Sequence, residues 1–154
     1  LNIREIDIVD HTKKSVLAVE PMLKGRTIKF DSDLKDLIIK ADPNRINQVT
    51  MNLLTNAIKH SPRKGEIIVS VREVKDGVKI SVQDFGKGIH EEKLDKIFTK
   101  FFQIDKAKGN IEGLGLGLFI SKEIVKAHHG QIDVESEYGK GATFSYTLPL
   151  KQNS

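Results

Sequence analysis

The sequence predicts an α+β sandwich, in which a mixed, mostly antiparallel sheet of about five strands is covered on one face by about three helices. Two observations support this class. About three long helical patterns and five or six strand patterns follow one another, and the helices accompany hairpins instead of alternating strictly with strands. The 154 residues suffice for one domain with a substantial core, but not comfortably for two. The other sheet face then stays near solvent or meets another domain.

The first 40 residues predict short strands around one helix. Residues 1–6 suit a short strand. Over residues 7–24 the apolar side chains roughly follow a helical period, and Gly25 can end that helix. Two further strands are expected at 26–30 and 37–40.

A strong helix is predicted from Asp42 to about Ser61. Asp42 at the cap and Pro43 in the first turn are typical of a helix start. One side of this helix carries Ile46, Thr50, Leu53, Leu54 and Ala57. The opposite side is polar and carries Arg45, Gln48, Asn52, Asn56, Lys59 and His60.

Two asparagines one helical turn apart, Asn52 and Asn56, are unusual on that polar side. A solvated face would explain polar residues there, but such faces favour Glu, Lys and Gln because Asn lowers helix propensity. Amide oxygens suit a hard cation such as Mg²⁺, and Lys59, one turn further on, suits a phosphate. The polar side is therefore either a solvated surface or a site for metal-bound phosphate.

A hairpin is predicted next, with strands at 66–74 and 78–84 around the Asp76-Gly77 turn. We expect a short helix at 90–98. The polar, Lys-rich stretch 99–113 that follows has a length typical of functional or mobile loops.

The last third of the chain predicts a second strong helix and a final hairpin. The helix should run from about 114 to 129, and one of its sides carries Leu116, Ile120, Ile124 and Ala127. Gly130 can end it. Strands at 131–136 and 142–148 should then pair around a glycine-containing turn.

The strand at 78–84 ends in an unexpected residue. One of its faces carries the apolar row Val78, Ile80 and Val82. The next residue on that face is Asp84, which opens the motif DFGKGI. An Asx-type turn, with Gly86 and Gly88 at positive φ, would account for the motif. A carboxylate at the end of a core-facing row is costly, however, unless a group donates to it. A ligand amine would serve, and the glycines would let a flat ring approach the backbone.

The motif GLGLGL (113–118) runs directly into the second strong helix. A glycine-rich turn that opens a helix presents free N–H groups and the positive end of the helix dipole, which together bind anions. The motif is not the dinucleotide fingerprint, because position 118 is Leu, and no Gly-Lys-Ser/Thr follows as in a P-loop. A flexible hinge is the alternative, although the leucines between the glycines favour packing.

Other candidate residues have simpler explanations. Gly139 and Gly141 suit a tight hairpin turn. The five histidines show no metal-ligand spacing, and the adjacent His128 and His129 suit a helix C-terminus while pointing in different directions. Without cysteine and without a Ser-His-Asp signature, a nucleophilic hydrolase has no support.

The composition is that of a soluble globular domain, with 38% hydrophobic and 30% charged residues. Lys and Arg number 25 against 21 Asp and Glu, so the formal charge is +4. This mild excess suits an anionic small molecule, and we expect no nucleic-acid partner. The absence of cysteine excludes disulfides and thiolate chemistry and is compatible with a cytoplasmic location.

No apolar run approaches the roughly 20 residues that a membrane span needs, and no signal peptide is visible. The chain begins with Leu rather than Met. We therefore expect residues 1–154 to be a single domain cut from a longer protein. Sensors, partner domains or a membrane anchor of that protein would lie in the missing part.

Together, the motifs resemble the ATP-binding catalytic domain of bacterial-type sensor histidine kinases. These belong to a larger family that includes type II topoisomerase, MutL-type and chaperone ATPases. The resemblance covers nearly the whole chain and is densest from Asp42 to Leu150. Residues 47–61 resemble the family's N box, DFGKGI its first glycine box, 96–103 its F box, GLGLGL its second glycine box and 139–144 the trailing one.

This resemblance implies a Bergerat-type fold that binds ATP and Mg²⁺. Asn56 would coordinate the Mg²⁺ that bridges the phosphates, and Asn52 would assist it directly or through water. Lys59 and His60 would contact phosphate, so the catalytic set is Asn52, Asn56 and Lys59. Asp84 would accept a hydrogen bond from the adenine amino group. Other implied nucleotide contacts are Gly86, Gly88, Ile89, Phe98, Gly113, Leu114, Gly115, Leu116, Gly117, Leu118 and Thr143. The stretch 99–113 would form a lid, in which Lys106 and Lys108 are candidate phosphate contacts.

Two departures from the family pattern bear on the reaction. Many relatives end the F box in Arg, where this chain has Gln103. The hydrolysing relatives carry a Glu one helical turn before the Mg²⁺-binding Asn, where this chain has Asn52. Because an amide cannot deprotonate water, we expect phosphoryl transfer to a side chain in two-component signal transduction rather than hydrolysis.

The acceptor in such kinases is a histidine in a motif resembling His-Glu-hydrophobic-Arg-Thr-Pro on a dimerising helix. None of the five histidines has that context. We therefore expect a phosphoacceptor domain upstream, a response regulator receiver domain as an indirect partner, and a monomeric fragment of a homodimeric protein. The alternatives are a self-sufficient ATPase, a non-catalytic docking module and a protein-serine kinase of the same fold.

Overall fold

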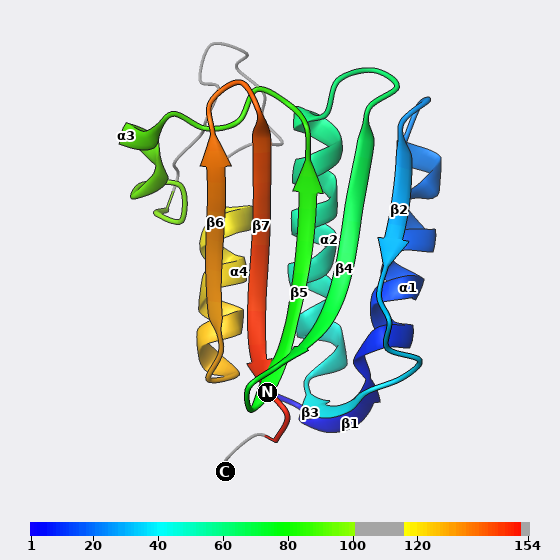
Figure 1. Cartoon of the computed structure of the whole chain (residues 1–154). Coiled ribbons are helices and arrows are strands. Elements are labelled where there is room, and N and C mark those ends of the chain that lie inside the picture. The colour runs from blue at the N-terminus through cyan, green and yellow to red at the C-terminus, as the bar shows by residue number, and fades with distance from the viewer. Residues whose placement is uncertain (101–115, 152–154) are drawn as a thin grey trace.

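The computed structural model describes residues 1–100 and 116–151. In this part of the chain, three long helices lie on one face of the main sheet and leave its other face uncovered, which confirms the predicted α+β sandwich (Figure 1). The elements are β1 (Arg4–Asp7), α1 (Ile8–Val19), η1 (Glu20–Met22), β2 (Thr27–Asp31), β3 (Ile38–Ala41), α2 (Pro43–His60), β4 (Glu66–Val74), β5 (Gly77–Asp84), α3 (Glu91–Leu94), α4 (Gly117–Ala127), β6 (Gln131–Glu137) and β7 (Gly141–Pro149).

The main sheet has five strands in the order β2-β4-β5-β7-β6. β2 runs parallel to β4, and the other neighbours are antiparallel. The two predicted hairpins, β4-β5 and β6-β7, therefore pair with each other through β5 and β7. In that pairing Asp84 lies opposite Ala142. β1 and β3 form a separate antiparallel pair.

Helix α2 begins and ends where the sequence predicts. The Oδ1 atom of Asp42 accepts the N–H groups of Asn44 at 3.1 Å and Arg45 at 3.3 Å. Pro43 occupies the first turn, where its missing N–H costs nothing. The backbone N–H of Ser61 donates to the carbonyl oxygen of Ala57 at 2.8 Å, and this hydrogen bond closes the last turn. These local signals fix the helix that carries the polar residues of the site.

The core lies between the inner face of the sheet and the three helices. β5 contributes Val78, Ile80 and Val82 to it, and α2 contributes Ile46, Leu53 and Leu54, all fully or almost fully buried. The hydroxyl groups of Thr50 and Tyr146 meet in this core at 2.7 Å. Burial raises the pKa of Tyr146, so its hydroxyl stays protonated.

The uncovered face of the sheet is largely polar. On β5 it carries Lys79, Ser81 and Gln83, which alternate with the buried row. Such a face can remain in water because its side chains are already solvated. Among the described residues, no helix has both the length and the apolar composition that a membrane crossing requires.

Two predicted helices are shorter in the structure. The helix expected over 7–24 ends at Val19, because Pro21 lacks the N–H needed to continue it, and η1 follows as a 3₁₀ turn. The helix expected over 90–98 is confined to α3. Residues after it form successive turns, with the N–H of Lys96 bonded to Lys93 and that of Thr99 to Lys96. These i→i+3 bonds are those of tight turns rather than of an α-helix.

The predicted helix over 114–129 corresponds to α4, which begins at Gly117; residues 114 and 115 lie outside the described range. Its buried face differs from the predicted one. Ala127 is exposed, and the buried residues are Ser121, Ile124, Val125 and, just after the helix, His128. As predicted, His128 and His129 point in different directions, since His128 is buried and His129 exposed.

Candidate functional site

Asp84 ends the buried row of β5, as the alternation predicts. Asp84 is only 2% exposed, and its Oδ1 atom accepts a hydrogen bond from the backbone N–H of Gly86 at 2.9 Å. Burial raises the pKa of Asp84, and hydrogen bonds from the backbone of Gly86 and Ala142 oppose that rise. The position therefore holds a carboxyl group whose charge costs energy in the free protein.

A small cavity adjoins this carboxyl group. It is partly open to solvent and is lined by His60, Asp84, Gly88, Ile89, Ala142 and Phe144. The walls combine apolar side chains with one acid, an arrangement common in small-molecule sites. The structure thus brings together His60 from α2, Asp84 from β5, and Gly88 and Ile89 from the loop after it.

The glycines of DFGKGI are required by close backbone packing. A Cβ atom on Gly86 would overlap the carbonyl oxygen of His60. Gly88 has a φ of +74°, and a Cβ there would lie 2.5 Å from the carbonyl oxygen of Glu137. Gly141 has a φ of +96°, and a Cβ there would overlap the carbonyl oxygen of Asp84. The loop is therefore pressed against both α2 and the β6-β7 hairpin.

Ser136 holds this loop in place, and sequence reasoning missed it. Its Oγ atom accepts the N–H of Ile89 at 2.7 Å and donates to the carbonyl of Gly141 at 2.8 Å. A signal was present, because the inward row of β6, Ile132 and Val134, ends in this hydroxyl just as the row of β5 ends in Asp84. Ser136 thus links the hairpin to the loop that lines the cavity.

The polar side of α2 contains the two asparagines. Asn52 donates through Nδ2 to the carbonyl of Gly117 at 3.2 Å and to Ser121 Oγ at 3.1 Å. The Nδ2 atom of Asn56 is buried and has no hydrogen-bond partner in the part of the chain that the structure describes. Lys59, one turn on, is exposed. An unpaired buried amide group indicates a partner outside the described residues.

These residues fit a metal ion that is held together with phosphate. Among residues 1–100 and 116–151, no cluster of three or more His, Asp and Glu side chains could hold a metal alone. Mg²⁺ commonly takes only one or two protein ligands, because substrate phosphates and water complete its shell. Asn56 has an amide oxygen of the kind that suits such a shared site, and its Nδ2, unpaired among the described residues, could donate to a phosphate oxygen.

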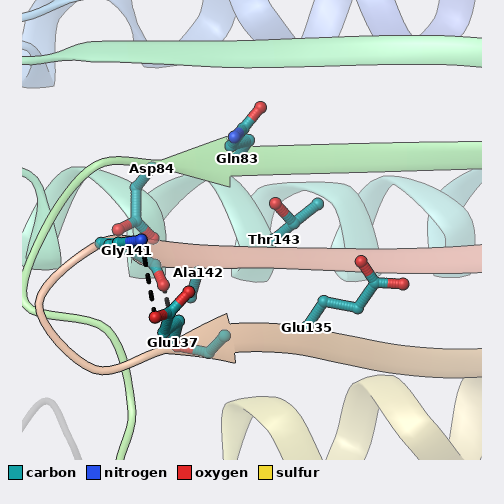
Figure 2. A pocket seen from close by; sticks show the side chains of 9 residues that line it. Gln83, Asp84, Glu135, Glu137, Gly141, Ala142 and Thr143 are labelled. Atoms are coloured by element: carbon teal, nitrogen blue, oxygen red, sulfur yellow. Dashed lines mark hydrogen bonds and ion pairs between the residues drawn. The ribbon is translucent and has the colours of Figure 1, made fainter.

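Two other predicted contacts, Phe98 and Thr143, are not among the residues that line the cavity but lie next to it. Phe98 is half-buried and meets Phe144 edge to face, with ring centroids 6.2 Å apart. Thr143 lies opposite Gln83 in the pairing of β5 with β7, and both line a shallow depression that Glu135 borders (Figure 2). Thr143 is not among the residues that line the cavity beside Asp84.

The second glycine motif is described only in part. Gly113, Leu114 and Gly115 lie outside the described residues, as do Gln103, Lys106 and Lys108. Leu116 precedes α4, Leu118 packs partly buried against the core, and Gly117 contacts Asn52. The start of α4 is thereby held beside the polar side of α2.

Comparison with known proteins agrees with these features. Residues 41–152 match the family described as histidine kinase-, DNA gyrase B-, and HSP90-like ATPase. Sensor histidine kinase ZraS of Klebsiella oxytoca is 48% identical over 153 residues, which cover 97% of this chain and 32% of that protein. This chain spans 22% of another relative, sensor histidine kinase WalK of Bacillus subtilis (strain 168), over which the two are 40% identical across 85% of this chain.

Solved structures share the fold. The nucleotide-free catalytic domain of histidine kinase ThkA has a TM-score of 0.85 and 29% identity, covering 98% of this chain and 97% of that one. ThkA has also been solved in complex with the response regulator protein TrrA. Full-length ShkA, in complex with AMPPNP, has a TM-score of 0.88 and 27% identity over all of this chain and 32% of that one. The chain therefore belongs to the histidine kinase-, DNA gyrase B- and HSP90-like ATPase family, as a catalytic domain of the sensor histidine kinase type.

Proposed function

We propose that this single domain binds Mg²⁺·ATP and transfers the γ-phosphoryl group to a histidine in another domain of the same protein. The observation that carries the proposal is the carboxyl group of Asp84, buried at the end of an apolar row and beside a cavity. Keeping a buried carboxylate charged costs free energy that an additional donor offsets. A ligand that brings an amine to this cavity would supply that donor.

Adenine meets these requirements. Its exocyclic amine donates to the Asp84 carboxylate, while its flat ring lies against the apolar walls formed by Ile89 and Phe144. The positions of Gly86 and Gly88 keep the backbone close to the acid without side chains between them. The complex of ShkA with AMPPNP, an ATP-like nucleotide, supports the same ligand class here.

In this proposal the polar side of α2 binds the phosphates and the Mg²⁺. Asn56 would hold Mg²⁺ through its amide oxygen, Asn52 would support it directly or through a water, and Lys59 and His60 would face the phosphate oxygens. The ion, when bound, would neutralise charge on the phosphates. The exposed Lys59 is free to turn toward them, since its flexible stem presents a point charge. The contacts proposed for Gly113, Leu114, Gly115, Leu116, Gly117 and Leu118 complete the phosphate site.

The reaction we propose is transfer rather than hydrolysis. Asn52 occupies the position one turn before Asn56, and its amide cannot take a proton from water. In the step, the bond between the γ-phosphorus and its bridging oxygen breaks, a bond from phosphorus to an imidazole nitrogen forms, ADP leaves, and the imidazole loses a ring proton. The domain contributes mainly positioning and charge neutralisation.

The proposed partners follow from the same reaction. The acceptor histidine belongs to a helical domain that also forms the homodimer, and the phosphoryl group then passes to a response regulator. The complex of ThkA with TrrA supports a partner of that class. The relatives named above are sensor kinases, which supports a role in two-component signalling.

The test combines the chain, Mg²⁺ and γ-labelled ATP with a helical acceptor segment from the parent protein. We expect acid-labile, base-stable label on the segment, as phosphohistidine gives, and no steady phosphate release by the chain alone. Replacing the acceptor histidine by Gln should abolish the label. Steady release of phosphate without an acceptor would instead identify a self-sufficient ATPase, and acid-stable label would identify a serine kinase.

A further inference from the structure

Ser121 is a buried hydroxyl on the inner face of α4, among Ile124 and Val125. It is 0% exposed, and its Oγ atom accepts a hydrogen from Asn52 Nδ2 at 3.1 Å. The same nitrogen donates to the carbonyl of Gly117, one turn earlier in α4, at 3.2 Å. Two acceptors on α4 therefore engage one amide group of α2.

This arrangement fixes which way the Asn52 amide faces. A side-chain amide carries two hydrogens on nitrogen and none on oxygen, and its terminal torsion is broad. With acceptors for both hydrogens on α4, the nitrogen end is held toward that helix. The oxygen end is then directed away from α4 and stays available. Without Ser121, one of the two constraints is lost.

Packing alone does not explain a serine here. An alanine would fill the buried position with little change in volume and would bury no hydroxyl. The hydroxyl is accommodated because Asn52, 69 positions earlier in the chain, donates to it. The contact therefore joins two elements of the nucleotide site rather than two turns of one helix.

We propose that Ser121 is a positioning residue that orients the amide of Asn52, so that Asn52 Oδ1 faces the Mg²⁺-bound phosphates. This inference rests on the function proposed above and extends it to a residue that does not itself touch the nucleotide. Such outer partners of metal-site groups commonly change metal affinity by about tenfold or more when removed. The effect should fall on the metal-dependent part of binding and spare the part that depends on Asp84.

The test measures the Kd of ATP by calorimetry in EDTA and in saturating Mg²⁺. The ratio of the two values reports the gain from the metal. Ser121→Ala should reduce this ratio by about tenfold while the Kd in EDTA stays within about twofold of wild type. Ser15→Ala is the matched control, because Ser15 is also a buried serine bonded to an asparagine of α2, Asn47, at 3.0 Å. That control should leave the ratio unchanged.

Further variants separate positioning from loss of structure. In an Asn52→Ala background, Ser121→Ala should have no further effect on the ratio, because there is no amide left to orient. Ser121→Cys is slightly larger and keeps a weaker acceptor, so it should shift the ratio less and in the same direction. If Ser121→Ala does not fold, the ratio measured for Ser121→Cys tests the inference in its place.

An unchanged ratio in Ser121→Ala and Ser121→Cys, with a reduced ratio in Asn52→Ala, would overturn the inference alone. An unchanged ratio in both Asn52→Ala and Asn56→Ala would show that the proposed metal site is wrong, and the inference would fall with it.

Discussion

The backbone N–H of Asp42 donates to Nε2 of His128 at 3.0 Å, across 86 positions of the chain. The other ring nitrogen, Nδ1, lies 2.9 Å from the carbonyl of Ile124, so the imidazole joins the end of α4 to the start of α2. Both ring nitrogens of His128 therefore face a backbone group, one on each helix. These two helices carry the phosphate side of the proposed site, and this contact fixes their relative placement.

The first prediction concerns Asp42 and acid stability. Burial by itself would raise the pKa of Asp42, but the N–H groups of Asn2, Arg45 and Asn44, together with His128, lower it. A carboxyl group with a lowered pKa stabilises the fold above its unfolded pKa of about 3.8, and that contribution is lost as the pH falls through the folded value. Asp42→Ala should therefore reduce the free energy of unfolding at pH 7 by about 0.5–2 kcal/mol.

Urea unfolding of Asp42→Ala and wild type at pH 7 and pH 3 provides the measurement. The difference between the two proteins should be smaller at pH 3, because the contribution of the carboxylate is lost as the pH falls below the unfolded pKa toward the folded one. Asp42→Asn is the control, because Asn caps a helix about as well and carries no charge. It should unfold nearer to wild type than Asp42→Ala does, and equal losses in both would point away from the cap.

Much of the fold could be predicted because its signals are local. The cap at Asp42 and Pro43 marks the start of α2, and the Asp76-Gly77 turn lies between the alternating patterns of β4 and β5. The inward placement of Asp84 followed from the period of two along β5. Each of these signals lies within a few residues of the feature it specifies.

The rest depends on contacts between distant segments. Ser121 on the inner face of α4 and His128 just after this helix are buried, although hydropathy alone assigns both to the outside, and Ala127, predicted on the same side as Ile124, is exposed. Both polar residues are buried because their partners, Asn52 and Asp42, come from α2. The loop contact of Ser136 spans 47 positions in the same way. No periodicity reports a hydrogen bond across such a separation.

Asp84→Asn should stabilise the free protein at neutral pH and weaken its binding of ATP. Burial raises the pKa of Asp84, so its contribution to stability is fully present below the unfolded pKa of about 3.8 and is lost as the pH rises through the folded pKa. At neutral pH, well above the unfolded pKa, the acidic group therefore makes the free protein less stable than it is in acid. The asparagine variant should unfold at higher urea than wild type at pH 7, with a smaller difference at pH 3.

The same substitution should weaken ATP binding by about tenfold or more, since a hydrogen bond to a charged partner contributes about 1.5–3 kcal/mol. Calorimetry at pH 7 gives both the affinity and the stoichiometry. Asp133→Asn, on the uncovered side of β6, is the control and should bind ATP like wild type. Equal affinities of wild type and Asp84→Asn would remove Asp84 from the base site.

Asn56→Ala should abolish the Mg²⁺ dependence of nucleotide binding. The buried Nδ2 of Asn56 has no partner among the described residues, so truncation removes an unsatisfied group and should not destabilise the free protein through lost hydrogen bonds. The affinity for ATP in EDTA should remain close to that of wild type, whereas the added affinity in Mg²⁺ should disappear. If the variant retained the full Mg²⁺ effect, the metal would have to bind elsewhere.

Ser136→Ala should loosen the loop that lines the cavity. The substitution leaves the N–H of Ile89 and the carbonyl of Gly141 without their partner, at a cost of about 1–3 kcal/mol for an unsatisfied buried group. Ile89 is only 4% exposed, so water cannot easily replace the lost hydroxyl. Hydrogen exchange at the Ile89 amide should become faster, and ATP binding should weaken because the cavity wall is less ordered.

Ser81→Ala, on the uncovered face of β5, should change neither quantity. Faster exchange with unchanged ATP affinity would show that Ile89 is held by Ser136 but does not contribute to the nucleotide site.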